Sequence, residues 1–321
     1  LEGFNVTIPY KEQVMPYLDD ITDKARAIGS VNTVLRRADG TLLGDNTDYD
    51  GFRLLLGDAA PFQGKKALVL GSGGASKTVQ KVLKDLGIRP VIISRRGENT
   101  YQNIDRHLDA ALLVNTTPVG MYPQVDETPL HLEGFQQLQL VLDLIYNPLR
   151  TRLLMEAEAL HIPARGGLLM LAGQAQEAAR LWGLIGEEDL AAQMAEEVEK
   201  TTRNIALIGM PGCGKTRIAN QLALLTGRRV LDTDAMVHKA QGLHPRDLIA
   251  QHGEEAFRAM ETKALKEAAR QSGMIIATGG GIVTVPENLE LLKQNSVILW
   301  IQRDLSLLSS KGRPLSQSIG I

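Results

Sequence analysis

Residues 209–216, GMPGCGKT, have the composition and spacing of a loop that binds nucleotide phosphates. The segment matches the pattern G-x-x-x-x-G-K-[ST] in full, an apolar run precedes it and a helical pattern follows it. In such loops the backbone N–H groups surround the phosphates, the lysine reaches the β- and γ-phosphates, and the hydroxyl binds Mg²⁺. We therefore predict a nucleotide site. Its residues are Gly212, Cys213, Gly214, Lys215 and Thr216, of which Thr216 is also a metal ligand.

An acidic pair follows the next predicted strand, in RRVLDTD at residues 228–234. One carboxylate of the pair Asp232 and Asp234 can hold Mg²⁺ through water, and the other can take the hydroxyls of a small acceptor. The alternative is that Asp-Thr-Asp only caps the N-terminus of a helix. The chain has no Asn-Lys-x-Asp motif, which disfavours a GTPase, and the apolar run at 274–277 ends in Thr-Gly-Gly-Gly rather than in an aspartate.

A second glycine-rich turn lies earlier in the chain, after the apolar run at 67–71 and before a helical pattern at 76–86. Its sequence approximates the dinucleotide-binding pattern G-x-G-x-x-G, but Ser76 stands where the last glycine is expected, and a simple tight turn is the alternative. The residues predicted to contact the cofactor here are Gly71, Ser72, Gly73, Gly74 and Ala75.

The residues after the next apolar run, 90–94, indicate which dinucleotide binds. An NAD site has an acidic residue there, which binds the ribose 2′-hydroxyl, whereas this chain has Ser94, Arg95 and Arg96. Two cations suit a 2′-phosphate, so the sequence favours NADP. The alternative is that these residues form only a solvated turn.

Several conspicuous segments lie before and after this turn in the sequence, and each alone has a simple structural explanation. Lys11 could be a surface lysine, and Asn32 or Asp48 could cap a turn. The segments are Asn5–Lys11, Val31–Thr33, Asn46–Asp48, Asn115–Met121, Asp143–Pro148 and Gly167–Gln174.

The composition excludes several classes of protein. Net charge is −2 and aromatic residues are 4 %, so no nucleic-acid or membrane partner is expected. A single cysteine permits no intramolecular disulfide and favours a reducing compartment, from which we expect a cytoplasmic location. The oligomeric state is left open by the sequence. A length of 321 residues with 44 % hydrophobic residues suits two or three α/β domains.

The motifs of residues 203–315, taken as an ordered set, resemble shikimate kinase. They are the phosphate loop, Asp232-Thr-Asp234, Glu254-Glu-Ala-Phe257-Arg258, Gly279-Gly280-Gly281 and Arg313-Pro-Leu. The resemblance implies a P-loop domain with a parallel sheet, similar to nucleoside-monophosphate kinases, that uses ATP and Mg²⁺. It implies that Arg258 binds the shikimate carboxylate and that Asp234 holds the ring hydroxyls and takes the proton. Gly279, Gly280 and Gly281 would contact the ring, and Arg313 would face the ATP phosphates.

The polar segments of residues 1–186 resemble shikimate dehydrogenase. This resemblance implies that Lys11 and Asp48 form a catalytic pair, which delivers a proton to the C3 oxygen of 3-dehydroshikimate while NADPH delivers hydride. It implies that Thr7, Asn32 and Gln174 hold the substrate hydroxyls. Tyr146 and Met121 would lie near the nicotinamide and the substrate.

Together the two resemblances define the expected domains. We expect a substrate domain at 1–56 to which 168–186 return, an NADP-binding Rossmann domain at 57–167, a helical linker at 187–202 and the P-loop domain at 203–321. We also expect truncation at both ends, because the families' first substrate-binding serines and their last kinase segment have no counterpart here.

The predicted function is a bifunctional enzyme that makes shikimate with NADPH and then phosphorylates it to shikimate 3-phosphate with Mg·ATP. One alternative is a non-catalytic sensor of quinate-like or shikimate-like ligands. Another is a fragment in which only one half works.

Overall fold

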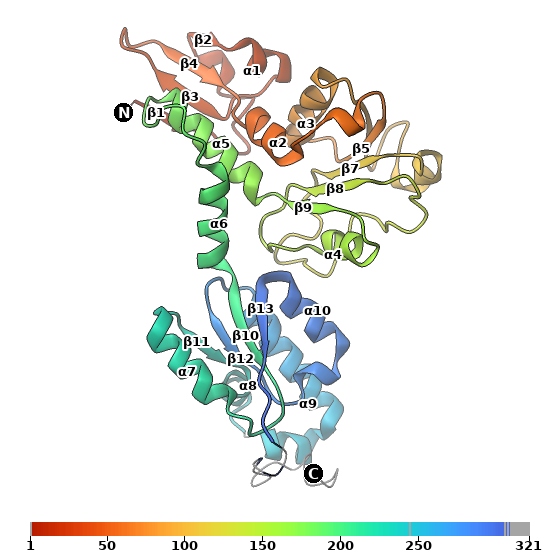
Figure 1. The fold of residues 1–321 in the computed structure, drawn as a ribbon, viewed down its shortest axis with the longest axis vertical. Helices are drawn as coiled ribbons and strands as arrows, with labels where there is room; N and C mark the ends of the chain where they lie inside the picture. The colour runs from red at the N-terminus through yellow and green to blue at the C-terminus, as the bar shows by residue number, and fades with distance from the viewer. Residues whose placement is uncertain (1, 244, 305, 307, 309–321) are drawn as a thin grey trace. The chain divides into compact units, whose positions relative to one another are not determined.

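The chain folds into two compact units, residues 1–197 and 198–321, and each is described by itself (Figure 1). The structure is a computed structural model that describes residues 2–243, 245–304, 306 and 308. No helix among these described residues is both long and apolar enough to cross a bilayer.

The first unit contains a small sheet with the strand order β1-β3-β4-β2. The turn at Asp39-Gly40 joins β3 to β4 in an antiparallel hairpin, and Gly40 has a φ of 89°, which glycine adopts without strain. A short helix packs beside the sheet, capped by Thr22, whose hydroxyl accepts from the N–H of Ala25. The elements are β1 (Gly3–Asn5), β2 (Asp20–Ile21), α1 (Asp23–Ile28), β3 (Thr33–Arg36), β4 (Leu42–Asp45) and the 3-10 turn η1 (Met15–Tyr17).

The same unit contains a parallel sheet with the order β6-β5-β7-β8-β9. Its central strands are mostly apolar and almost wholly buried, as parallel sheets with helices on each side require; the exceptions are one polar residue at an end of each, Lys66, Asn115 and Asp143. One hydrophobic cluster lies on each face of the sheet. The strands are β5 (Lys66–Leu70), β6 (Arg89–Ile93), β7 (Leu112–Asn115), β8 (Leu140–Asp143) and β9 (Ala164–Gly166). The helices are α3 (Gly74–Asp85) and α4 (Arg152–Ala159), with 3-10 turns η2 (Ala60–Phe62) and η3 (Tyr101–His107).

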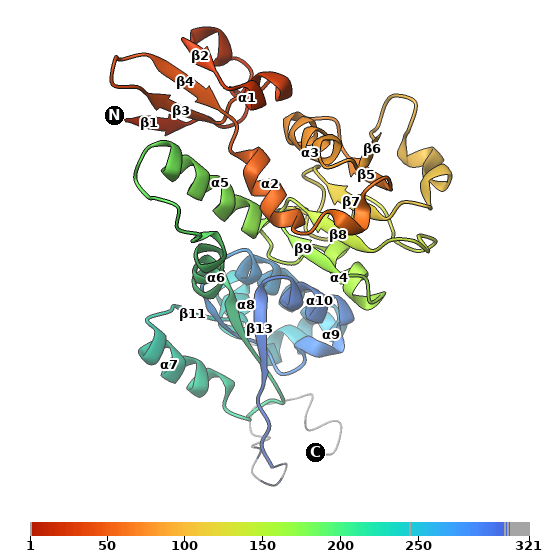
Figure 2. The ribbon, with the colours of Figure 1, turned by 45° about the horizontal axis from the view of Figure 1, so that its top comes forward.

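Two helices pack side by side between these sheets, α2 (Asp48–Leu56) and α5 (Leu168–Leu181) (Figure 2). Each is long enough to carry polar residues toward the small sheet at one end and apolar residues into the parallel sheet's core at the other. Arg165 ties β9 to α2 because its guanidinium donates to the carbonyls of Leu55 and Leu56 at 2.9 and 3.0 Å. Helix α6 (Ala191–Thr202) follows, and the division between the two units falls inside it.

The second unit is built on a parallel sheet with the order β11-β12-β10-β13. The predicted α/β class is confirmed in both units. The helix Pro245–Ala269 contains an interruption, since Gly253 has a φ of 83° and lies outside helical geometry. The strands are β10 (Asn204–Ile208), β11 (Val230–Asp232), β12 (Ile275–Ala277) and β13 (Ser296–Trp300). The helices are α7 (Lys215–Thr226), α8 (Thr233–Gln241), α9 (Pro245–Ala269), α10 (Pro286–Asn295) and the 3-10 turn η4 (Ile282–Thr284).

Candidate active sites

Lys11 and Asp48 form an ion pair in the first unit, with 2.7 Å between Nζ and Oδ2. Asp48 is the first residue of α2 and is buried, and Lys11 lies in the loop after β1 with a quarter of its side chain exposed. The N–H of Val31 donates to the Lys11 carbonyl at 2.8 Å, which fixes this loop beside the start of β3. An ammonium and a carboxylate at this distance can pass a proton to a bound oxygen.

Asn32 hydrogen-bonds two further segments beside this pair. Its Nδ2 donates to Oε1 of Gln174 on α5 at 3.3 Å. Its Oδ1 accepts from the N–H of Thr47 at 2.8 Å, immediately before Asp48. Four of the predicted residues, Lys11, Asn32, Asp48 and Gln174, therefore come together. Thr7 is exposed on the same loop as Lys11 and lines a hollow of about 770 Å³ with Asn5 and Tyr10.

The first glycine turn is exposed to solvent over residues 72–75. Gly71 directly follows β5 with a φ of 105°, and Gly73 is the N-cap of α3, where no side chain caps the unpaired N–H groups of the first turn. A Cβ built on Gly73 or Gly74 would meet no atom within 4 Å. An uncapped helix N-terminus with free space before it fits a pyrophosphate. Ser72 and Ala75 are exposed on this turn, whereas Ser76 is buried and accepts from Gln80.

Arg95 and Arg96 follow β6, which is the position that distinguishes NADP from NAD. Both side chains are exposed, and neither forms an ion pair with another described residue. The hydroxyl of Ser94 donates to the carbonyl of Arg96, and the N–H of Ser94 donates to the carbonyl of Asn99 at 3.2 Å. These bonds stabilise the turn and do not involve the arginine side chains. The guanidinium groups are thus available to a 2′-phosphate.

Met121 and Tyr146 lie on the loops after β7 and β8, with exposed fractions of 43 and 48 %. The N–H of Tyr122 donates to the carbonyl of Asn147 at 3.4 Å, which joins the two loops. Among the described residues, no hydrogen bond connects either side chain to Lys11 or Asp48. The loops that carry Met121 and Tyr146 are therefore hydrogen-bonded to each other, but the two side chains are not part of the hydrogen-bonded cluster around Lys11 and Asp48.

The phosphate loop of the second unit has the backbone that its glycines predict. Gly209, Gly212 and Gly214 have φ values of 145, 83 and 104°, a region that side-chain-bearing residues rarely adopt. Nζ of Lys215 donates to the carbonyls of Gly209 and Met210 at 2.7 and 3.1 Å. Gly214 is the N-cap of α7 without a side-chain cap, and Cys213 is buried behind the loop. The bare helix end fits a phosphate group.

The two residues predicted to hold Mg²⁺ lie in contact, because the Thr216 hydroxyl donates to Oδ2 of Asp232 at 2.9 Å. The other oxygen of Asp232 accepts from the N–H of Ala235 at 3.1 Å, so this carboxylate is also the N-cap of α8. The capping interpretation of Asp-Thr-Asp is therefore observed at one oxygen of Asp232, and the binding of Mg²⁺ by the other oxygen stays a prediction. A hydroxyl and a carboxylate side by side are oxygen ligands of the type that Mg²⁺ takes, with water completing its coordination.

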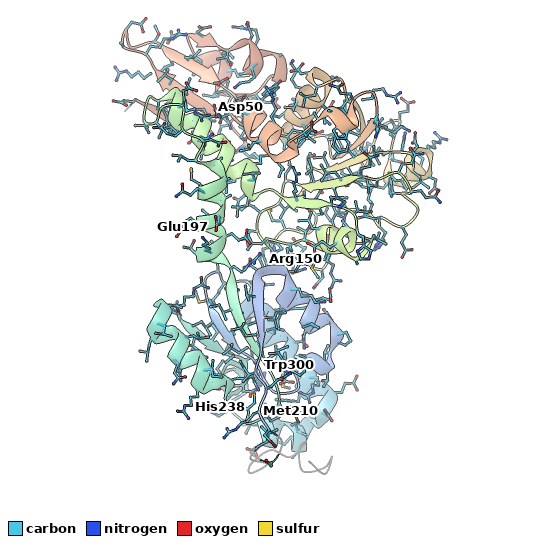
Figure 3. The ribbon with its side chains drawn as sticks, viewed as in Figure 1. Asp50, Arg150, Glu197, Met210, His238 and Trp300 are labelled. Atoms are coloured by element: carbon cyan, nitrogen blue, oxygen red, sulfur yellow. The ribbon has the colours of Figure 1, made fainter. Side chains whose placement is uncertain are left out.

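The predicted acceptor residues converge at the end of β12. A Cβ built on Gly281 would collide with the guanidinium of Arg258, and one built on Gly279 would lie 2.7 Å from Oδ1 of Asp234. Burial, followed by the neighbouring charge of Asp232, raises the pKa of Asp234. Gly280 packs against Pro211 of the phosphate loop, which places the acceptor cluster beside the nucleotide loop (Figure 3 labels Met210 there, with Trp300 at the end of β13).

Glu261 belongs to this cluster and was not predicted. It is 2 % exposed, and its Oε2 accepts from NH1 of Arg258 at 2.5 Å, while Glu254 accepts from NH2 at 3.1 Å. Burial raises the pKa of Glu261. The signal was present in the sequence, since an acidic residue three positions after Arg258 on a helix lies on the same face. The predicted Arg313 lies outside the described residues.

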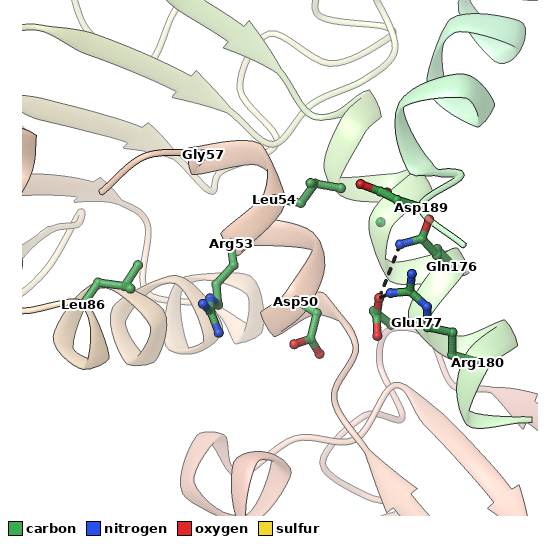
Figure 4. Close-up of a pocket in the computed structure, with 10 residues that line it drawn as sticks. Asp50, Arg53, Leu54, Gly57, Leu86, Gln176, Glu177, Arg180 and Asp189 are labelled. Carbon is green, nitrogen blue, oxygen red and sulfur yellow. Dashed lines mark hydrogen bonds and ion pairs between the residues drawn. The ribbon is translucent and has the colours of Figure 1, made fainter. Parts of the chain in front are cut away.

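A separate hollow of about 440 Å³ lies beside α2 and α5 in the first unit (Figure 4). Glu177 and Arg180 pair across its wall, and Arg180 is further occupied by the carbonyls of Gly186, Glu187 and Glu188. None of the predicted site residues lines it. We therefore assign it no role in the chemistry.

Comparisons with known proteins identify the families that the two units resemble. Residues 211–318 match the family model described as shikimate kinase, and residues 1–34 match the model described as shikimate dehydrogenase substrate binding domain. The shikimate dehydrogenase (NADP(+)) of Clostridium beijerinckii is 40 % identical over 196 residues, which span 57 % of this chain and 72 % of that protein. A protein of the same name from Clostridium perfringens strain SM101 is 34 % identical over 215 residues, 62 % of this chain and 79 % of that protein.

Solved structures give the same result for the first unit. A chorismate mutase/shikimate 5-dehydrogenase fusion protein from Clostridium acetobutylicum has a TM-score of 0.57 at 35 % identity, over 62 % of this chain and 77 % of that one. The shikimate 5-dehydrogenase of Thermus thermophilus, in complex with NADP(H) and shikimate, has a TM-score of 0.53 at 36 % identity, over 61 and 77 % of the two chains. Both predicted resemblances are confirmed. The chain therefore belongs to the shikimate dehydrogenase family, and it joins that dehydrogenase to a shikimate kinase domain.

Proposed function

We propose that this fusion protein catalyses two consecutive reactions, the reduction of 3-dehydroshikimate to shikimate and the phosphorylation of shikimate to shikimate 3-phosphate. The observation that carries the proposal is the 2.7 Å contact between Lys11 and Asp48, which unites a proton donor and its partner beside Asn32 and Gln174. When bound, NADPH would supply a hydride and Mg·ATP a phosphoryl group.

In the dehydrogenase half, Lys11 protonates the carbonyl oxygen of the substrate as this oxygen becomes a hydroxyl. Asp48 keeps the ammonium oriented through their ion pair and shares the proton with it. Thr7, Asn32 and Gln174 bind the other hydroxyls and hold the carbonyl carbon in place. Gly71, Ser72, Gly73, Gly74 and Ala75 hold the cofactor's pyrophosphate, Arg95 and Arg96 its 2′-phosphate, and Met121 and Tyr146 flank its nicotinamide.

In the kinase half, Arg258 binds the shikimate carboxylate, because a guanidinium pairs with a carboxylate in two parallel hydrogen bonds. Asp234 accepts the proton of the hydroxyl that attacks the phosphorus. Lys215 and Arg313 offset the charge on the phosphate oxygens, and Thr216 and Asp232 hold Mg²⁺. A cytoplasmic location, with its reducing conditions, is part of this proposal and is supported by the single cysteine of these 321 residues.

The two halves can be tested against each other in one chain. Incubation with 3-dehydroshikimate and NADPH should oxidise the cofactor and form shikimate, and added Mg·ATP should convert shikimate to its 3-phosphate. Lys11→Met should abolish only the first reaction and Lys215→Ala only the second, so each variant shows by its other activity that the chain is folded. Binding of shikimate by calorimetry with neither reaction in the unmutated chain would establish a sensor and refute the proposal.

A further inference from the structure

Asp143 is a fully buried carboxylate at the carboxyl end of β8 that no part of the proposed chemistry uses. Its Oδ1 accepts from Nδ2 of Asn115 at 3.0 Å and from the N–H of Ile145 at 3.1 Å. Its Oδ2 accepts from the hydroxyl of Thr151 at 2.7 Å. No ion pair joins it to any residue that the structure describes. Burial of an unpaired carboxylate is costly, so its retention calls for a role that an apolar side chain cannot fill.

The first consequence concerns the orientation of Asn115, the last residue of β7 and the strand partner of Asp143. A carboxylate only accepts, so it selects the NH₂ side of the Asn115 amide and turns its oxygen the other way. That oxygen accepts from the N–H and the hydroxyl of Thr117 at 3.0 and 2.7 Å. The Thr117 hydroxyl in turn accepts from the N–H of Val119 at 3.3 Å. Asp143 thus fixes the start of the loop 115–121.

The end of the loop 115–121 lies beside Thr151, which is another hydrogen-bond partner of Asp143. Gly120 is buried with a φ of 95°, and a Cβ built on it would lie 3.6 Å from Cβ of Thr151. Thr151 is held by Asp143 and caps α4 by accepting from the N–H of Leu154 at 3.4 Å. The loop that presents Met121 is therefore anchored near both of its ends through one carboxylate.

The loop after β8 is tied into the same network. The N–H of Ile145 donates to Asp143, the N–H of Leu144 donates to the carbonyl of Asn115 at 3.0 Å, and Tyr122 donates to Asn147. Tyr146, at the tip of this loop, is about half exposed. On the opposite side of β7, the hydroxyl of Thr116 donates to the carbonyl of Leu70 at 2.6 Å, directly before the glycine turn.

We propose that Asp143 is a positioning residue for hydride transfer: through Asn115, Ile145 and Thr151 it holds the loops of Met121 and Tyr146 at the place where the nicotinamide must lie. This proposal rests on the proposed dehydrogenase function. The 2′-phosphate and pyrophosphate are bound elsewhere, at Arg95, Arg96 and the glycine turn. Loss of Asp143 should therefore impair the hydride step more than it impairs binding of the cofactor.

The test compares Asp143→Ala with Asp143→Asn in the full chain. Asp143→Ala leaves the donors of Asn115, Ile145 and Thr151 without an acceptor, and we expect kcat for NADPH oxidation to fall roughly 10- to 100-fold. The dissociation constant of 2′-phospho-ADP-ribose, which lacks the nicotinamide, should stay unchanged. The primary isotope effect with 4-deuterated NADPH should rise, because hydride transfer becomes rate-limiting. Asp143→Asn keeps an acceptor oxygen and should restore most of kcat.

Hydrogen exchange on the cofactor-free protein gives a readout that does not depend on activity. In Asp143→Ala, amides of 116–121 and 144–148 should exchange faster, while those of β5 keep their protection. Gln176→Ala is the matched control, because Gln176 is also buried and anchors two backbone N–H groups, those of Leu190 and Ala191 at 2.5 and 2.7 Å. It should leave kcat and these loops unchanged.

Three results would overturn the proposal. They are an unaltered kcat in Asp143→Ala, an equal loss of kcat in Gln176→Ala, and faster exchange spread evenly over the first unit. Absence of NADPH oxidation in the unmutated chain would instead refute the proposed function, and the exchange experiment would still decide whether Asp143 anchors the two loops.

Discussion

Gly51 on α2 and Gly173 on α5 face each other where the two helices cross, and a Cβ built on Gly173 would lie 3.1 Å from Cα of Gly51. A Cβ built on Gly51 would lie 2.5 Å from the carbonyl oxygen of Met170 and 3.0 Å from the backbone nitrogen of Gln174. Asp48 begins α2 one turn earlier, and Gln174 follows Gly173 directly. The separation of these two predicted site residues is therefore set by backbone packing at one glycine pair.

Gly51→Ala tests this relationship, because helix propensity and packing predict opposite changes in the free energy of unfolding of the first unit. Alanine in place of a helical glycine should stabilise the helix by about 1 kcal/mol. The clash with α5 should instead lower the free energy of unfolding of the first unit by roughly 1–3 kcal/mol and raise KM for 3-dehydroshikimate. Urea unfolding and steady-state kinetics measure both effects. Gly186→Ala is the control, since its new Cβ would meet only the flexible carboxylate of Glu188. A more stable Gly51→Ala protein would contradict the packing argument.

Local spacing was enough to predict the two glycine turns and the placement of Thr216 near Asp232. Both features lie at the carboxyl ends of parallel strands, which meet at one edge of the sheet even where another strand lies between them, so a motif at one strand end predicts its partners. The Asn32–Gln174 hydrogen bond spans 142 positions and depends on how α5 packs against α2, which no local pattern encodes. Asp143 stands out in the apolar run LVLDLI by its charge, but its hydrogen bonds to Asn115 and Thr151 could not be predicted, because they depend on the three-dimensional contacts at the end of β8.

The pair Arg95 and Arg96 should determine the choice of cofactor. Replacement of both by alanine removes the exposed cations after β6, and the ratio of kcat/KM for NADPH to that for NADH should fall by about 10-fold or more, since a hydrogen bond to a charged group contributes about 1.5–3 kcal/mol. Arg26→Ala, an exposed arginine on α1, should leave the ratio unchanged. An unchanged ratio in the double variant would show that these arginines form only a solvated turn.

Stability of the first unit should depend on pH through Asp143. Burial raises the pKa of this carboxyl to about 6, whereas an unfolded aspartate titrates near 3.9. Between these values the folded protein holds a proton that the unfolded chain has released, so stability falls as pH rises from about 4 to 6. The loss is on the order of 3 kcal/mol at most.

Unfolding of the first unit can be followed separately, because that unit has its own tryptophan, Trp182. Trp182 lies in the first unit with its Nε1 donating to the carbonyl of Val34 at 2.9 Å, and Trp300 can be replaced by phenylalanine. Unfolding followed by Trp182 fluorescence should show the pH dependence in the parent protein and a flatter profile in Asp143→Asn. The exposed Asp189→Asn should keep the parent profile. Equal profiles for all three proteins would exclude Asp143 as the titrating group.

Arg258 should influence the kinase half in two separable ways. Burial raises the pKa of Asp234, and the positive charge of Arg258 lowers it. The guanidinium of Arg258 also donates hydrogen bonds to Glu254 and Glu261. Arg258→Lys keeps the charge but cannot make the parallel bonds to a carboxylate, so KM for shikimate should rise roughly 10- to 100-fold. Because Asp234 must be ionised to take the proton, kcat falls as the pH drops through the pKa of Asp234. This fall in kcat on the acidic side of the pH profile should occur at the same pH in Arg258→Lys, because the positive charge is kept.

Arg258→Met separates the charge from the geometry. Loss of the cation leaves burial and Asp232 to raise the pKa of Asp234 further, so the acidic limb of the kcat profile should move to higher pH. Profiles measured at saturating shikimate, with the NADPH-dependent activity of the same chain as the folding control, distinguish this shift from weaker binding. If the limb stays in place while KM rises in both variants, Arg258 acts on the substrate alone and Asp234 is not the group whose ionisation limits phosphorylation.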